Sequence, residues 1–209
     1  MRMNSDLERA FKNIIKHVPD YQTVLKSLHV ENGDAIASDG HQILLVKKFA
    51  PKGMSFDLRL DTFEFADPKN KYPETAEIWP RYHNVGFEVP STRLRPLLKL
   101  LKALNSDMPI KLSFDGAGMT LNHANKSDGI QFSYTMPVLN YDCASATASD
   151  IYCNPEFLID AFTFFTSKQF QYCVATFKFG EAAAPFTIST KADVGEVKYL
   201  IAPMDMKER

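Results

Sequence analysis

The sequence contains few cysteines and no long uninterrupted apolar run. Cys143, Cys153 and Cys173 form no C-x-x-C pair, and an odd count without metal-ligand spacing favours free thiols in a reducing compartment. The longest apolar stretches, residues 97–104 and 157–165, contain charged residues, so we expect no membrane span. The N-terminal run MRMNSDLERA lacks the apolar segment of a secretory signal, which predicts a cytoplasmic protein.

An excess of charge of one sign is also absent. The sequence has 24 basic residues and 25 acidic ones, for a net charge of −1. This balance excludes a strongly cationic protein that coats nucleic acid, but it permits a local basic surface, because the two signs can lie on different faces. With 209 residues, of which 45% are apolar, the chain can form one large domain or two small ones around a buried core.

Sequence motifs for catalysis or cofactor binding are scarce. The five histidines lie far apart and include no H-x-x-x-H pair, and no G-x-S-x-G or Walker motif occurs. The Gly-Ala-Gly run at 116–118 lacks the third glycine of a dinucleotide loop. We therefore expect no cofactor, no metal and no catalytic site. An enzyme alternative would use Asp39 and His41 with a distant Cys153, whereas the simpler interpretation is a turn aspartate and a surface histidine.

Apolar residues at helical spacing predict three helices, at residues 5–17, 91–104 and 154–166. Each helix begins with a residue suited to cap its free N–H groups. Ser5 is followed by Glu8 in capping-box spacing. Asn154 is followed by Pro155 at the favoured first helical position, and Ser91 is the expected cap of the middle helix.

Short strand-like runs follow each helix. After the first two helices, Asn-Gly or Asp-Gly pairs separate them and supply the positive φ angles of tight turns, and after the third they are separated by Gly180 and a turn at residues 193–195. The expected strands are residues 23–30, 35–38 and 42–47 after the first helix, 110–114, 119–123 and 130–135 after the second, and 172–179, 185–189 and 196–202 after the third. Two further short strands, 86–89 and 150–153, precede the second and third helices. The pattern predicts an α+β protein that uses a unit of one helix and three strands three times.

Two segments lack this pattern. Residues 50–80 contain four prolines and predict an irregular connector with one strand at 55–65. Residues 139–149 are rich in alanine and serine and predict a second linker.

Basic residues line one face of each of the first two predicted helices. They are Arg9, Lys12 and Lys16 in the first helix, and Arg95, Lys99 and Lys102 with the nearby Arg93 in the second. Each row lies opposite the apolar stripe of its helix, as the solvated face of any amphipathic helix does. The third helix differs, because its charged positions are Glu156 and Asp160.

Four segments carry a resemblance to a known family. Residues 37–43, ASDGHQI, are similar to A-T-D-G-H-R-L, and residues 72–80, YPETAEIWP, to F-P-D-Y…V-x-P. Residues 152–161, YCNPEFLIDA, are similar to F-N-x-x-Y-L-x-D-A-L, and residues 199–206, YLIAPMDM, to Y-V-x-M-P-M-R-L. In this order, the motifs are those of the bacterial sliding clamp, the β subunit of DNA polymerase III. The resemblance covers about residues 20–48 and 72–206.

The resemblance implies a DNA-clamp fold, in which repeated half units of a helix and antiparallel strands pair into domains. Helices line a ring and sheets lie outside. This chain would form about one and a half to two clamp domains. We expect an N-terminal half domain at 1–70, a linker at 71–82 and a C-terminal domain at 83–209.

The resemblance also implies a non-enzymatic processivity factor of DNA replication, which encircles double-stranded DNA and contacts phosphates without reading sequence. The two basic rows would then line the ring. DNA polymerase or other replication proteins would insert a short hydrophobic peptide into a C-terminal groove. Carried over by motif, the groove residues are Ile43, Pro73, Ile78, Leu200, Ala202, Pro203 and Met204. Alternatively, Leu200 and Ile78 are simply core residues.

Several positions depart from the family pattern. Gln42 and Asp205 replace arginines, and Ala202 replaces a methionine, which would make the groove shallower. The chain has about three half units, so a dimer supplies only three domain equivalents. A ring of six would need four chains, or a half unit completed by a partner chain, so we expect a homo-oligomer. A phage origin would suit the short length. The alternative function is a clamp-fold protein-interaction module that does not encircle DNA.

Overall fold

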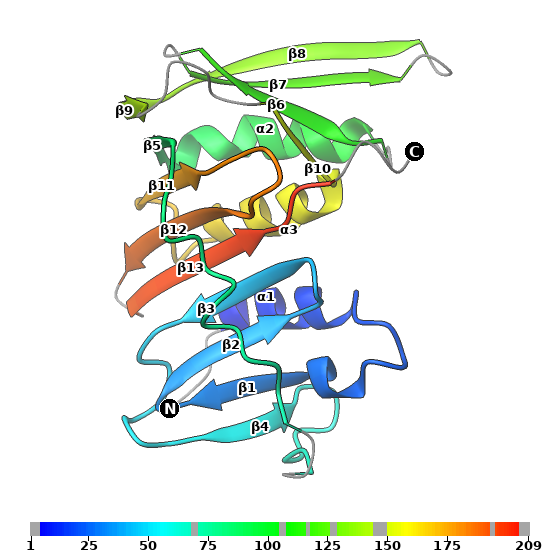
Figure 1. Ribbon diagram of the computed structural model, residues 1–209, viewed down its shortest axis with the longest axis vertical. Coiled ribbons are helices and arrows are strands. Elements are labelled where there is room, and N and C mark those ends of the chain that lie inside the picture. The colour runs from blue at the N-terminus through cyan, green and yellow to red at the C-terminus, as the bar shows by residue number, and fades with distance from the viewer. Residues whose placement is uncertain are drawn as a thin grey trace.

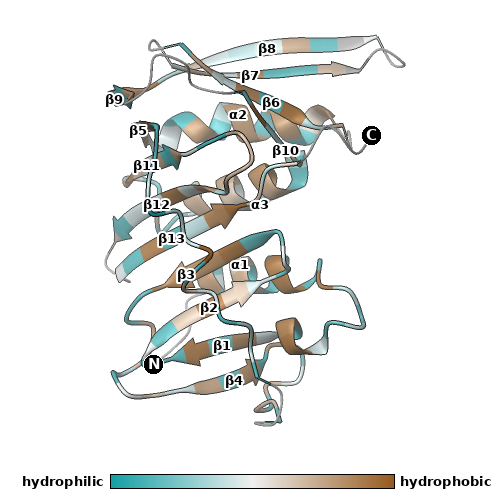
Figure 2. Cartoon of the chain, in the orientation of Figure 1, coloured by the Kyte–Doolittle hydropathy of each residue, from teal (hydrophilic) through white to brown (hydrophobic). Residues whose placement is uncertain are grey.

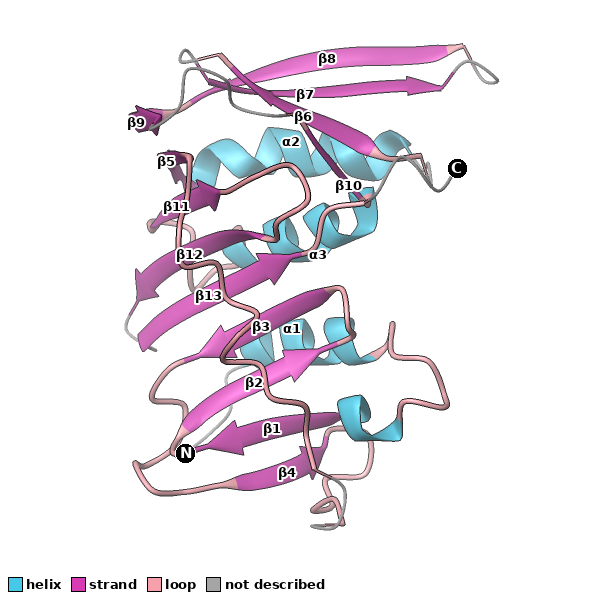
Figure 3. Ribbon diagram, viewed as in Figure 1, coloured by secondary structure: helices cyan, strands magenta, loops and turns pink. Residues whose placement is uncertain are grey.

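The computed structural model describes residues 5–67, 71–104, 108–115, 118–125, 129–143, 150–192 and 195–204. It contains three α-helices, α1 (Ser5–Ile15), α2 (Ser91–Leu104) and α3 (Pro155–Phe165), and a short 3₁₀ helix, η1 (Thr23–Lys26). Figures 1 and 3 show the α-helices one below another in the order α2, α3, α1, behind a long antiparallel sheet. The helix α3 packs against both α1 and α2.

Two antiparallel sheets contain all the strands. The larger sheet has nine strands in the order β4 (Phe56–Arg59), β1 (Ser27–Glu31), β2 (Asp34–Ser38), β3 (Gln42–Val46), β13 (Gly195–Ile201), β12 (Phe186–Ala192), β11 (Val174–Phe179), β5 (Val85–Pro90) and β9 (Leu139–Cys143). The smaller sheet has four strands in the order β10 (Ile151–Cys153), β6 (Ile110–Phe114), β7 (Gly118–Asn125) and β8 (Ile130–Pro137). The pairing of β3 with β13 joins the N-terminal unit to the C-terminal end of the chain.

The predicted helices are present, and the predicted cap of α3 is confirmed, whereas the hydroxyl of Ser91 donates to the carbonyl of Cys173 at 2.9 Å. The helix α2 has the predicted bounds, and α3 begins at Pro155 with Asn154 as its cap. The Oδ1 atom of Asn154 accepts a hydrogen bond from the N–H of Glu156 at 2.9 Å. The helix α1 ends at Ile15, before the predicted end at residue 17. Local sequence patterns were sufficient to predict the helices because each helix buries one apolar stripe.

Three predictions about strands were wrong in part. Residues 23–26 form η1 rather than the start of a strand, and the N–H of Leu25 bonds to the carbonyl of Gln22 at 3.1 Å. The predicted linker at 139–149 begins with β9, because the edge of β5 pairs with it, and residues 144–149 lie outside the described residues. The strand expected at 55–65 is limited to β4, since the chain turns back and forms a bridge between Leu58 and Phe65.

The C-terminal region consists of two interlocked units. The strand β5 precedes α2 but pairs with β11, which follows α3. Conversely, β10 precedes α3 but pairs with β6, which follows α2. Each unit therefore completes the sheet of the other, and their helices α2 and α3 pack together. The N-terminal unit, with α1 and β1–β3, has no second unit of this kind in the described part of the chain. This organisation fits one and a half clamp domains.

One main core runs through both regions. Figure 2 shows hydrophobic positions concentrated in the paired strands β3 and β13 and in β1. Within the C-terminal region, the rings of Phe87, Phe177, Phe179 and Phe186 pack on one another with centroids 4.8–6.3 Å apart. These fully buried rings fix the sheet against α2 and α3, so the helical side is a rigid surface.

Candidate nucleic-acid interface and peptide site

All seven basic residues singled out in the sequence are exposed on the helical side of the protein. They are Arg9, Lys12 and Lys16 with α1, and Arg93, Arg95, Lys99 and Lys102 on α2. Since α3 packs between the other two helices, the two basic rows flank it rather than adjoin each other. Both rows lie on the same side of the long sheet.

The charge of this helical face differs from that of the whole chain. The helix α2 contains four basic residues and no acidic one. Residues 5–17, 91–104 and 155–165 together contain seven basic and four acidic residues, which is a net charge of +3 with histidine neutral. The full chain has a net charge of −1, so the remainder is acidic. Positive charge is thus segregated onto the helices, and such a surface attracts polyanions.

The contacts that these basic side chains make within the chain are weak. Lys12 pairs with Glu8 at 2.7 Å, and its Nζ lies 5.3 Å from the centroid of the Phe63 ring. On α2, Arg95 donates to the side chain of Gln171 at 3.3 Å. Exposed ion pairs contribute about 0–1 kcal/mol, so exchanging them for contacts with a ligand costs little.

Asp160 on α3 is not the solvated acidic residue that the sequence pattern suggested. Its side chain is 9% exposed, and its Oδ2 atom lies 3.0 Å from Nε2 of His17. Asn13 donates to Oδ1 at 3.5 Å, and the Lys16 ammonium lies 3.9 Å away. The C-terminal end of α1 therefore offsets the charge of Asp160, which leaves Glu156 as the exposed acidic residue of α3.

The His17–Asp160 contact predicts a pH-dependent stability. The hydrogen bond to Asp160 raises the pKa of His17 above its ordinary value, so the folded state favours the protonated form. This stabilisation is complete below about pH 6.5 and is lost as pH rises through the raised pKa. We expect His17→Gln to reduce the fall in unfolding free energy between about pH 5.5 and 8.5, measured by urea titration. The exposed His83→Gln serves as control, and equal pH slopes in both variants would contradict this assignment.

A second apolar cluster lies on the opposite face of the sheet from the helices. Leu44 and Tyr199 belong to the main core, and their neighbours Ile43 and Leu200 point to the other face because side chains alternate along a strand. Ile43 and Leu200 are opposite each other in the β3–β13 pair. With Ile36 they form a buried cluster against which Leu45, Tyr72 and Trp79 pack. We call these six residues the outer cluster.

The other residues carried over to the groove differ in their exposure. Pro73 and Ile78 are exposed, and Ile78 retains 44% of its surface. Ala202, Pro203 and Met204 are half-buried. The N–H of Ala202 bonds to the carbonyl of His41 at 2.8 Å, which fixes the C-terminal segment beside the β2–β3 turn. Leu200, in contrast, is only 2% exposed beneath the linker aromatic residues.

Sequence reasoning did not single out Ile36, Leu45, Tyr72 and Trp79 as members of this cluster. The signal for two of them was present, because alternation along β2 and β3 places Ile36 and Leu45 on the same face as Ile43. Tyr72 and Trp79 reach the cluster through the path of the linker, which no local pattern encodes.

Asp39 belongs to a buried polar network rather than to a catalytic pair. Its Oδ1 atom accepts the backbone N–H groups of His41 and Gln42, both at 2.8 Å, and its Oδ2 accepts the Gln42 side chain at 2.9 Å. The Gln42 Oε1 atom in turn accepts the hydroxyl of Tyr199 at 2.6 Å. Gln42 is fully buried, so the residue that departs from the family motif holds β3 and β13 together.

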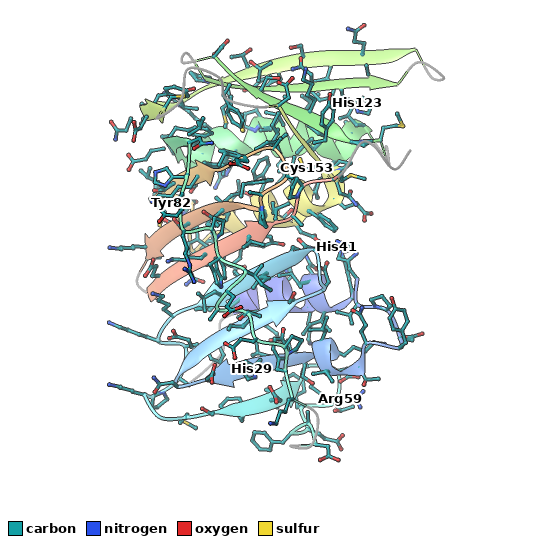
Figure 4. All side chains as sticks on the ribbon, in the orientation of Figure 1. His29, His41, Arg59, Tyr82, His123 and Cys153 are labelled. Carbon is teal, nitrogen blue, oxygen red and sulfur yellow. The ribbon has the colours of Figure 1, made fainter. Side chains whose placement is uncertain are left out.

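His41 and Cys153, the other two residues of the enzyme alternative, are also unsuited to a catalytic role. Figure 4 labels His41 and Cys153, which come from different elements, and the ring of His41 stacks on that of Phe157 in α3 with centroids 5.9 Å apart. Cys153 is fully buried, and burial raises the pKa of its thiol. A buried thiol with a raised pKa is a poor nucleophile, so this geometry disfavours an enzyme built on these three residues.

The described residues also bear on metal binding and on membrane insertion. No group of three or more potential metal-ligating side chains is present within them. No helix in that part of the chain is both long and apolar enough to cross a membrane.

The fold is that of the sliding clamps. Neither the protein-family models nor the curated proteins include a match to this sequence. Among solved structures, the sliding clamp of Caulobacter crescentus matches with a TM-score of 0.72 and 18% identity, over 99% of this chain and 68% of that one. The sliding clamp of Bacillus subtilis matches with a TM-score of 0.70 and 16% identity, over 96% and 63%. The β subunit from DNA polymerase of Streptococcus pyogenes matches with a TM-score of 0.70 and 14% identity, over 95% of this chain and 64% of that one.

These comparisons confirm the resemblance at the level of the fold. The chain spans between 63% and 68% of the length of the three solved clamps. Its mixture of helices and antiparallel sheets corresponds to about one and a half clamp domains. The chain therefore has the sliding-clamp fold of DNA polymerase III β subunits, in a shorter form.

Proposed function

We propose that this protein is a non-enzymatic accessory factor of DNA replication that binds duplex DNA with its helical face and client peptides at its outer cluster. The observation that carries the proposal is the segregation of charge on a clamp fold. The helices have a net charge of +3 in a chain of net charge −1, and all seven basic residues that the sequence singled out are exposed.

The chemistry of the helical face suits binding without sequence recognition. Lysine and arginine side chains on helices that cannot enter a groove contact phosphates, which are the same at every base pair. Each contact releases condensed counterions, so binding is favourable but exchanges readily along the duplex. A protein held this way can slide, which is the property that a processivity factor needs.

The outer cluster suits a short hydrophobic peptide. Ile36, Ile43 and Leu200 form its buried floor. As its margin we propose Ile78, next to Trp79 in sequence, and Met204, whose N–H bonds to the carbonyl of Tyr152 at 2.7 Å. Methionine adapts its shape to different apolar partners, and such margins accept several related sequences. We propose DNA polymerase or another replication protein as the source of this peptide.

The proposal divides the chain into a half domain at 1–70, a linker at 71–82 and a full domain at 83–209. Because one chain spans less than the length of a full clamp, encircling a duplex requires several copies, and we propose a homo-oligomer.

The test is the salt dependence of duplex binding. Fluorescence anisotropy with two unrelated duplexes of equal length is expected to give equal affinities. The logarithm of the association constant is expected to fall with the logarithm of salt concentration, with a slope of about −4 to −6 for roughly four to seven phosphate contacts. Absence of binding at about 50 mM salt and high micromolar protein would instead favour a clamp-fold protein-interaction module that does not encircle DNA.

A further inference from the structure

An apolar surface is left partly exposed at the outer end of the N-terminal unit. It consists of Phe56, Leu58, Phe63 and Phe65, which we call the Phe65 patch. Phe65 is 74% exposed and Phe63 is 58% exposed, and the rings of Phe56 and Phe65 meet edge to face at 5.7 Å. Solitary exposed apolar residues are common, but a contiguous group of aromatic side chains marks an interaction site.

The Phe65 patch faces the helical side of the sheet. Leu58 is opposite Leu28 in the β1–β4 pair, and Phe65 is opposite Leu58 across a β-bridge. Residues opposite each other in a sheet point to the same face. Leu28 is fully buried in the main core with α1, so Leu58 and Phe65 continue that apolar row beyond the edge of the core.

Comparison with the C-terminal domain shows which element the described part of the N-terminal unit lacks next to the Phe65 patch. There, β5 pairs with the first strand after α3, and the chain then forms α2, which packs beside α3. In the N-terminal unit, β4 takes the same place beside β1, the first strand after α1. Among the described residues, however, no helix follows β4 before α2. Instead the chain turns back, with the N–H of Ala66 bonded to the carbonyl of Asp57 at 2.9 Å.

We propose that the Phe65 patch binds the same patch of a second copy of this chain around a two-fold axis. The two N-terminal units would then form one composite domain, with the two α1 helices on either side of the axis as α2 and α3 are in the C-terminal domain. A single self-complementary patch is what a two-fold dimer requires. The composite domain would lie between two complete C-terminal domains, in a row of three.

The charges around the patch favour this occupant. Basic and acidic residues are mixed there, with Lys12, Lys26 and Arg59 near Asp61 and Glu64. When a surface packs against its own copy, charges of a single sign would repel each other across the interface. A mixture of acidic and basic residues avoids this repulsion, because opposite charges can pair across the two-fold axis. Exposed phenylalanines at its centre supply the aromatic contacts that carry much of the binding energy of such interfaces.

This inference rests on the homo-oligomer of the proposed function, for which it names the interface. Assembly is measured without DNA or peptide, so a failure of this interface is distinguishable from a failure of DNA or peptide binding. Sedimentation equilibrium of the full chain is expected to give a mass twice that of the 23.6 kDa protomer at micromolar concentration. Phe65→Glu would bury an unpaired carboxylate next to the axis, and we expect it to weaken the dimer by about 100-fold or more.

Two further variants make the test specific. Tyr172→Glu changes an aromatic residue that is 89% exposed in another region, and Ser133→Lys places a charge on the β8 edge; both are expected to leave the dimer intact. Circular dichroism checks that each variant is folded. A monomeric wild-type protein at about 50 μM would overturn the proposal. A dimer of unchanged affinity in the Phe65→Glu variant would also overturn the proposal. Dissociation of the dimer by Ser133→Lys would do the same.

Discussion

Reversing two charges on α2, with Arg95→Glu and Lys99→Glu together, is expected to lower the affinity for duplex DNA about 100-fold at about 50 mM salt. These residues lie four positions apart on one face of the helix that has no acidic side chain. Each loses a phosphate contact and gains a charge that repels phosphate. The net charge of the helical face would change from +3 to −1.

The salt dependence offers a second measurement on the same variant. Because each phosphate contact contributes about 0.9 to the slope, the loss of two contacts is expected to make it shallower by about 1.8. Both substituted side chains are exposed, and their loss leaves the main core unchanged, so the thermal stability should remain close to that of the wild type.

The matched control reverses two lysines away from the helices, Lys52→Glu and Lys178→Glu. Lys178 is exposed on β11, where its neighbour Phe177 points into the core, so Lys178 points away from the helical face. The control changes the net charge of the protein by the same amount and is expected to lower the affinity less than about threefold at the same salt concentration. Equal losses in both variants would mean that net charge, rather than the helical face, governs binding.

Local patterns in the sequence were sufficient to predict most of the elements, and the resemblance of four motifs to a known family implied the clamp fold. The helix α2 appeared at its predicted bounds because its apolar stripe is encoded within its own residues. The strand β9 was missed because its structure depends on β5, where Val85 lies opposite Cys143, more than 50 residues away in sequence. A strand that forms only because it pairs with the open edge of a distant strand carries no recognisable pattern in its own residues.

The same limit applies to the candidate sites. Exposure of the basic rows follows from helical periodicity, so the sequence could predict it. The burial of Asp160 could not be predicted, since its partner His17 is 143 residues away. In the outer cluster, a motif suggested that Ile43 and Leu200 belong together, but only the register of β3 against β13 explains why they are neighbours. The packing of Trp79 against the buried residues of this cluster depends on the path of the linker across the sheet.

Replacing the two partly accessible residues that we propose as the margin of the outer cluster, with Ile78→Asp and Met204→Asp together, is expected to weaken client-peptide binding about 100-fold. Loss of roughly 1.5 kcal/mol of apolar contact at each site gives about 3 kcal/mol, which corresponds to that factor. Leu200 is unsuitable for this test. It is 2% exposed at the centre of the β3–β13 pair, and an aspartate there would destabilise the whole protein.

Trp79 provides the readout for peptide binding. It is the single tryptophan of the chain and packs on the outer cluster, so a peptide bound there is expected to change its fluorescence. The probe is a hydrophobic pentapeptide selected from a random library on the wild-type protein. The control pair, Leu139→Asp on β9 with Val174→Asp on β11, replaces apolar residues of similar exposure, 41% and 43% against 44% for Ile78. A peptide that binds the Ile78 and Met204 variant with wild-type affinity, or that binds the wild type without changing Trp79 emission, must occupy another surface.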